Sequence, residues 1–189
     1  TVSGISTNPT LVANGNIVFG GSGATRTVTV TPAANQAGTA TITVTVSDGT
    51  LTADDTFLLT VTAVNDAPTL SDLGAQTVTE DTATGTLAFT VGDAETPVAS
   101  LTLSGTSDST TLVPNGNIVF GGTGATRTVT VTPAADQTGT ATITVTVSDG
   151  TLTAVDTFLL TVTAVNDAPT LSDLGAQTVS EDTATGPIP

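Results

Sequence analysis

The sequence repeats itself almost unchanged at an offset of 101 residues. Residues 1–88 align with residues 102–189 with only fourteen differences, and the stretch "AVNDAPTLSDLGAQTV" occurs without a change at Ala63–Val78 and Ala164–Val179. A period near one hundred residues is too long for solenoid repeats or propeller blades and matches a whole small domain. We therefore expect tandem copies of one domain.

Within one period, the local pattern is that of short β-strands. The run "TATITVTVS" (Thr39–Ser47) alternates a hydroxyl residue with a mostly apolar one, which is typical of a strand with one buried face. Turn-forming pairs such as Asp48-Gly49 separate the runs. The apolar members predict one inner face, with threonines between them facing water: Val28, Val30, Ile42, Val44, Val46, Phe57, Leu59 and Val61.

Seven such strands can be placed in the middle period. They are expected near residues 76–79, 85–91, 100–105, 117–120, 125–132, 138–148 and 151–162. Seven short strands in a unit of this length predict an all-β fold of tandem Greek-key β-sandwiches of the immunoglobulin or cadherin type, arranged as a linear array.

The register of the repeat divides the chain into three parts. Residues 1–66 are expected to be a repeat that lacks its first two strands, residues 67–167 a complete repeat, and residues 168–189 the opening strands of a third. A partial sandwich exposes its inner face and its unpaired edges. We therefore expect the partial repeats to be completed, either by further repeats of a longer array or by strands of a neighbouring chain.

The composition excludes several classes of function. The chain has a net charge of -15, with seventeen carboxylates against two arginines, so nucleic acid is not an expected partner. No apolar run is long enough to cross a membrane, and direct membrane insertion is not expected. Because His, Cys and Lys are absent, no nucleophile with its usual base can be built, and we expect no enzyme.

Five segments in a fixed order carry a resemblance to a known family. They are "VNDAPTL", "TEDTATG", "VGDAETP", "RTVTVTPAADQTGTATITVTVSDGT" and "TFLLTVTAVND". In this order and spacing, the whole chain resembles the cadherin-like tandem repeats of giant bacterial surface proteins and adhesins. The resemblance implies an extracellular location on the surface of a bacterial cell.

The resemblance also implies calcium at the joints between repeats. The implied ligands are Asn65, Asp66, Asp93, Glu95 and Asp149 at the first joint, and Glu80, Asp136, Asn166 and Asp167 at the second. Ala63 and Ala67 stand where the family's linker motif has two further ligands, so the set is reduced. Calcium takes about six to eight oxygen ligands. The alternative is that these acids are solvated residues of turns and loops.

The expected function is mechanical. We expect a non-catalytic spacer, stalk or surface fibre, whose partners are neighbouring repeats of the same protein or neighbouring identical subunits. The alternative is a self-assembling filament, in which terminal strands of one chain complete the partial repeat of the next. Carbohydrate binding and ice binding are weaker alternatives, because the chain has five Phe but no Trp or Tyr to line a sugar site, and sandwich sheets twist whereas ice-binding faces are flat.

Overall fold

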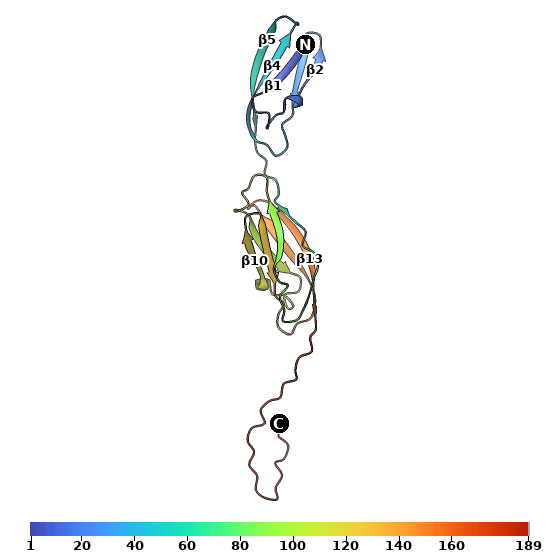
Figure 1. Cartoon of the computed structure of the whole chain (residues 1–189), viewed down its shortest axis with the longest axis vertical. Helices are drawn as coiled ribbons and strands as arrows, with labels where there is room; N and C mark the ends of the chain where they lie inside the picture. The colour runs from blue at the N-terminus through green and yellow to red at the C-terminus, as the bar shows by residue number, and fades with distance from the viewer. Residues whose placement is uncertain (189) are drawn as a thin grey trace.

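The computed structural model describes residues 1–188 and shows an all-β fold. Two β-sandwiches lie end to end along the long axis, and a strand-free segment leaves the far end of the second one (Figure 1). We name these parts the first unit (residues 1–61), the joint (residues 62–68), the second unit (residues 69–163) and the C-terminal segment (residues 164–188). The expected tandem β-sandwich architecture is confirmed.

The second unit contains two four-stranded sheets. Their orders are β10-β11-β8-β6 and β7-β13-β12-β9, and every pairing is antiparallel except that of β13 with β7. The strands are β6 (Thr69–Leu70), β7 (Gln76–Thr79), β8 (Leu87–Gly92), β9 (Thr102–Ser107), β10 (Ile118–Thr123), β11 (Thr126–Val131), β12 (Gly139–Ser148) and β13 (Thr153–Thr163), with a 3-10 turn at Asn115–Asn117. All seven expected strands form, and β6 is an eighth.

The first unit has the same plan with fewer strands. Its sheets are β1-β4-β5 and β2-β3. The strands are β1 (Val2–Ser6), β2 (Ile17–Ser22), β3 (Thr25–Val30), β4 (Gly38–Ser47) and β5 (Thr52–Val61), with a 3-10 turn at Asn14–Asn16. They correspond in sequence to β9–β13, so the first unit has no counterpart of β6, β7 or β8.

The alternation of threonine and apolar residues produces the core of the second unit. Along β12, Ala141, Ile143, Val145 and Val147 are buried, and the threonines between them are only half-buried. Phe89 and Val91 of β8 cover the opposite side of the same cluster. This packing confirms, in the second unit, the inner face that the pattern predicts.

The same residues are far more exposed in the first unit. The exposed fractions of Val28, Val46 and Phe57 are 38%, 51% and 39%. Their counterparts Val129, Val147 and Phe158 are exposed by 0%, 0% and 3%. The strands carry identical residues at these positions, so the difference comes from the residues that cover them. The buried cluster of the first unit is correspondingly small: Leu11, Val12, Ile17, Ala40 and Ile42.

The C-terminal segment forms no strand. It repeats residues 63–87 with three substitutions, Ser180 for Thr79, Pro187 for Thr86 and Ile188 for Leu87. In the second unit, those residues form β6 and β7, and β7 is held by pairing with β13. The C-terminal segment has no later strand within the chain to pair with, and an isolated strand is unstable in water. Its assignment to a third repeat stays a prediction. Within residues 1–188, no helix has the length and apolar character that a membrane span requires.

Candidate functional site at the joint

The joint is tied to the turn that follows β12. Nδ2 of Asn65 donates a hydrogen bond of 2.7 Å to Oδ2 of Asp149. The other carboxylate oxygen of Asp149 accepts the backbone amides of Thr151 and Leu152, at 2.6 and 2.7 Å. These bonds favour the charged carboxylate, so they lower the pKa of Asp149, and Asn65 contributes most. One joint side chain therefore links the linker to a turn 84 residues away.

A second link runs from the joint to the loop between β8 and β9. The backbone amide of Asp66 donates to Oε2 of Glu95 at 3.0 Å. Asp93 shapes this loop, because its Oδ1 accepts the amides of Glu95 and Thr96 at 2.9 and 2.7 Å. The other oxygen of Asp93 is buried without a hydrogen-bond partner. Asp93 thus positions Glu95 beneath the linker.

All five residues implied at the first joint therefore take part in hydrogen bonds around the linker. Asn65 reaches Asp149, Asp66 reaches Glu95, and Glu95 reaches Asp93. Within the described residues, however, no three acidic side chains converge closely enough to hold a metal ion. The arrangement forms two separate links rather than one cage of oxygens. Calcium binding at this joint stays a prediction of the resemblance.

The residues implied at the second joint do not converge either. Glu80 is buried, and its Oε1 accepts the backbone amide of Val165 at 2.6 Å, just beyond the end of β13. Asp136 donates its backbone amide to Oδ1 of Asp81 at 3.1 Å. Asn166 and Asp167 contact each other through the Asn166 amide. Glu80 and Asp81 therefore fix the lower end of the second unit.

Sequence reasoning did not single out Asp81. It adopts a left-handed backbone with a φ of 61°, which Asp tolerates better than most residues. Its carboxylate faces the turn of Asp136, which is also left-handed, with a φ of 55°. The available signal was the Glu-Asp-Thr sequence after β7, which is typical of a turn.

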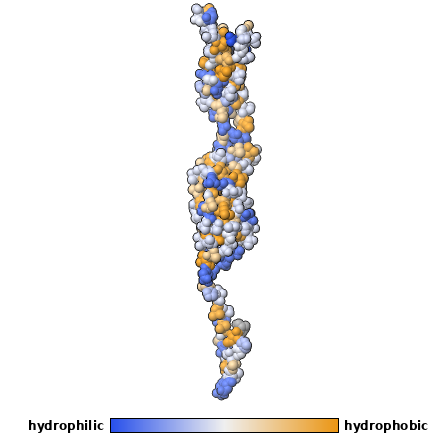
Figure 2. All heavy atoms as spheres, turned by 90° about the vertical axis from the view of Figure 1, so that its right-hand side faces the viewer, coloured by the Kyte–Doolittle hydropathy of each residue, from blue (hydrophilic) through white to orange (hydrophobic). Residues whose placement is uncertain are grey.

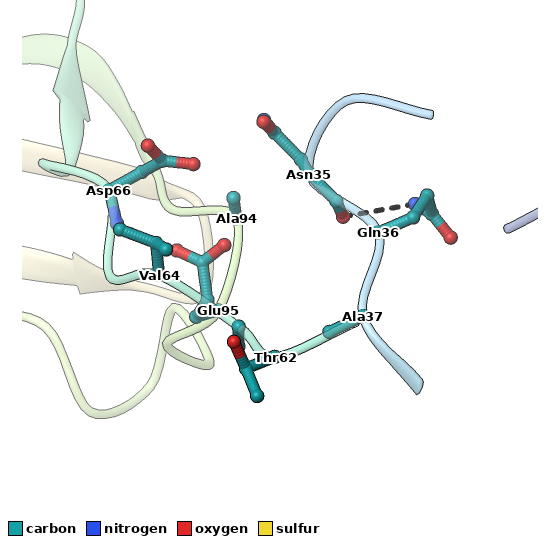
Figure 3. Close-up of a pocket in the computed structure, with 9 residues that line it drawn as sticks. Asn35, Gln36, Ala37, Thr62, Val64, Asp66, Ala94 and Glu95 are labelled. Atoms are coloured by element: carbon teal, nitrogen blue, oxygen red, sulfur yellow. Dashed lines mark hydrogen bonds between the residues drawn. The ribbon is translucent and has the colours of Figure 1, made fainter. Parts of the chain in front are cut away.

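A shallow groove lies beside the joint (Figure 3). Parts of both units line it: Asn35, Gln36, Ala37, Thr62, Ala63, Val64, Asp66, Ala94 and Glu95. The lining is formed by small, amide and acidic residues. Glu95 already accepts the Asp66 amide, so it acts here in positioning the linker.

The comparisons with known proteins agree with this fold. Residues 65–163, more than half of the chain, match the Bacterial Ig domain family, so the chain belongs to that family. No curated protein matches the chain.

Solved structures that the chain matches at low identity include a surface layer protein and titin. Domains 1–6 of the surface layer protein SbsC give 22% identity and a TM-score of 0.43, over 88% of this chain and 20% of that one. SbsC domains 4 and 5 give 23% and 0.41, over 86% and 70%. Titin domains Z1Z2, in complex with telethonin, give 17% and 0.44, over 88% and 82%. The chain spans only a fifth of the length of the first of these.

Proposed function

We propose that the chain is a segment of an extracellular bacterial array of Ig-like repeats, which serves as a non-catalytic spacer, stalk or surface fibre. The observation that carries the proposal is the end-to-end stacking of two units of nearly identical sequence across a short, hydrogen-bonded joint (Figure 1). Such stacking converts the number of repeats into length. With long strands of about ten residues at about 3.3 Å each, plus turns, each repeat adds roughly 40 Å.

The contacts of the joint favour a restricted range of angles between the two units. Asn65 and Asp66 hold two different loops of the second unit, one through a side chain and one through a backbone amide. Pro68, two residues after Asp66, fixes one further backbone angle of the joint. A seven-residue linker with these constraints differs from a flexible Gly/Ser linker, whose ends move independently.

The surface chemistry supports an extracellular structural role. The net charge of -15 keeps neighbouring arrays apart. The absence of cysteine, lysine and histidine leaves few reactive side chains, and threonine supplies strands that are polar on their outer face. An adhesive tip, where one exists, belongs to another part of the array in this proposal.

Spin labels test the joint directly, because the chain has no native cysteine. Thr39 and Thr140 are exposed and occupy equivalent positions in the two units, so Thr39→Cys and Thr140→Cys together report one repeat length. We expect a single narrow distance distribution by pulsed electron paramagnetic resonance. The matched comparison adds Asn65→Ala and Glu95→Ala, which should broaden it. A distribution equally broad with and without these two changes would contradict a stiff joint.

A further inference from the structure

We propose that Glu80 and Asp156 are a pair of latches that keep the second unit folded when the array is under tension. Each carboxylate binds one backbone amide at one end of the contact between β7 and β13. The inference rests on the proposed function, because a spacer that is held at both ends carries tension along its length. It assigns the resistance to that tension to two side chains.

Tension enters the second unit at opposite ends. The rod narrows at the joint and again below the second unit, and these two segments transmit force to it (Figure 2). β7 and β13 pair in parallel, with Gln76 opposite Leu160 and Thr79 opposite Thr163. The joint pulls on the N-terminal side of β7, and the chain beyond β13 pulls on the C-terminal side of β13 (Figure 1). The two strands are therefore pulled in opposite directions along their common axis.

The ladder between β7 and β13 has two loaded ends. Each strand stretches most where the force enters it, so the outermost bonds carry the largest share of the load. The ladder spans only four residue pairs. Parallel pairing is also slightly less stable per residue than antiparallel pairing. Contacts immediately beyond the two ends therefore decide how much tension the unit withstands.

Glu80 makes the contact at the lower end of the ladder. Its backbone amide donates to the carbonyl of Thr163 at 2.9 Å, and its Oε1 accepts the amide of Val165 at 2.6 Å. The side chain is 7% exposed, and a hydrogen bond in such a low-dielectric site is stronger than one in water. Val165 is the second residue after β13. Tension that arrives from below therefore loads the bond to Glu80 before it loads β7.

Asp156 makes the contact at the joint end of the ladder. Its Oδ2 accepts the amide of Leu73, a buried residue between β6 and β7, at 2.7 Å. The bonds of the joint and β6 are loaded first at this end, and β6 is paired with β8 through only two residue pairs. β8 belongs to the other sheet. Once β6 separates, the pulled segment is attached to β13 at Leu73.

The two latches act in opposite senses. Glu80 follows β7 and holds the backbone beyond β13, whereas Asp156 lies on β13 and holds the backbone before β7. Each latch is thus at the end where the strand that it holds is pulled. Hydrogen bonds to a carboxylate are shorter and stronger than those between neutral groups. The stronger kind of bond therefore closes both ends of the ladder.

The repeat carries both carboxylates at its offset of 101 residues. Asp55 is the counterpart of Asp156, and Glu181 is the counterpart of Glu80. Neighbouring positions differ, since Val155 corresponds to Asp54. A device that resists tension has to occur in every unit of an array, because the weakest unit unfolds first. The positions of these carboxylates meet that requirement.

Optical tweezers on the full chain test the latches. The chain has no native cysteine, so Thr62→Cys and Thr170→Cys, both at exposed positions, attach handles on either side of the second unit. The first unit then lies outside the loaded segment. The measured quantity is the rate of unfolding at a fixed force, which governs forced unfolding. Glu80→Ala and Asp156→Ala should each raise this rate by at least about tenfold, because each removes a hydrogen bond to a charged group that breaks before the barrier.

Asp108→Ala is the matched control. Oδ1 of Asp108 accepts the amide of Thr142 at 2.8 Å, which is a bond of the same kind between the end of β9 and β12. This bond is intact when β7 separates from β13, so its loss should change the rate under force by less than about twofold. Glu80→Gln and Asp156→Asn keep an oxygen that accepts the amide, and their rates should lie between the native and alanine rates.

A native rate of unfolding in either Glu80→Ala or Asp156→Ala would overturn the proposal. So would an equal acceleration in Asp108→Ala, because loss of stability alone would then explain the effect. Amide variants that unfold as fast as the alanine variants would also overturn it, because the missing acceptor would not be the cause. None of these results bears on the spacer role, which is tested by the dimensions of an array without force.

Conversely, an array that proves compact would refute the spacer and leave the rates measured on the second unit unchanged.

Discussion

The two units offer the same phenylalanine in two environments, which allows a matched test of burial. Phe158 is 3% exposed in the second unit, and its counterpart Phe57 is 39% exposed in the first. We predict that Phe158→Ala destabilises the second unit by about 3–5 kcal/mol, because it leaves an enclosed cavity. Phe57→Ala should cost the first unit only about 1–2 kcal/mol, because roughly three-fifths of the ring is buried and the open face leaves no closed cavity.

The assay must resolve the two units. The chain has no Trp or Tyr for fluorescence, and residues 40–53 and 141–154 are identical, so mass spectrometry of such peptides cannot separate them. Urea unfolding followed by nuclear magnetic resonance can, because the amides have different surroundings. Equal losses of stability in the two units, or a larger loss from Phe57→Ala, would refute the reasoning.

Three further predictions concern the joint and the lower end of the second unit. Asn65→Ala should raise the pKa of Asp149 toward its ordinary value, because the Asn65 side chain contributes most to lowering it. The pKa of Asp48, the equivalent residue of the first unit, should not change, because it is lowered by the backbone amides of Leu51 and Thr50 and not by Asn65. Because the pKa of Asp149 is lower in the folded state, its charged carboxylate stabilises the fold above the ordinary carboxyl pKa, and this stabilisation is lost as the pH falls through the lowered folded-state pKa. Carboxyl chemical shifts measured as a function of pH give the pKa values of Asp149 and Asp48. Glu80→Ala should lower the free energy of unfolding of the second unit by about 1–3 kcal/mol in urea, because it leaves the Val165 amide without its acceptor. Glu181 is the exposed counterpart of Glu80, and Glu181→Ala should lower the free energy of unfolding by less than about 0.5 kcal/mol. Calcium bound at a joint should raise the melting temperature relative to chelator, and an unchanged melting temperature would reject the implied metal sites.

The strands could be predicted because their pattern is local. The alternation of Thr and apolar residues in β12 predicts both its extended conformation and the face that is buried. β6 was not predicted because two residues are too few to show any periodicity. The burial of Leu112 and Val113 was not predicted either, because they lie in the connection between β9 and the 3-10 turn, where no strand pattern indicates a buried face.

Burial in the first unit could not be read from local sequence. Arg127 is half-buried and donates to the carbonyl of Val98, whereas Arg26, in an identical local sequence, is exposed and donates to the carbonyl of Gly21. The difference comes from the loop before β9, which has no counterpart in the first unit. Identical strands therefore differ in burial because their distant partners differ.

The contacts at the joint were predictable only in part. The resemblance selected Asn65 and Asp149, which form a direct hydrogen bond although 84 residues separate them. It did not show that the side-chain amide of Asn65 donates directly to the carboxylate of Asp149. Asp66 likewise contributes its backbone amide to Glu95, a role that its side-chain type does not reveal.

Small-angle X-ray scattering on arrays with increasing numbers of the repeat at residues 67–167 tests the spacer role most directly. End-to-end stacking across a stiff joint predicts that the maximum dimension grows linearly, by roughly 40 Å for each added repeat. Growth with the square root of repeat number, as expected for freely jointed units, would contradict the account, as would a compact particle.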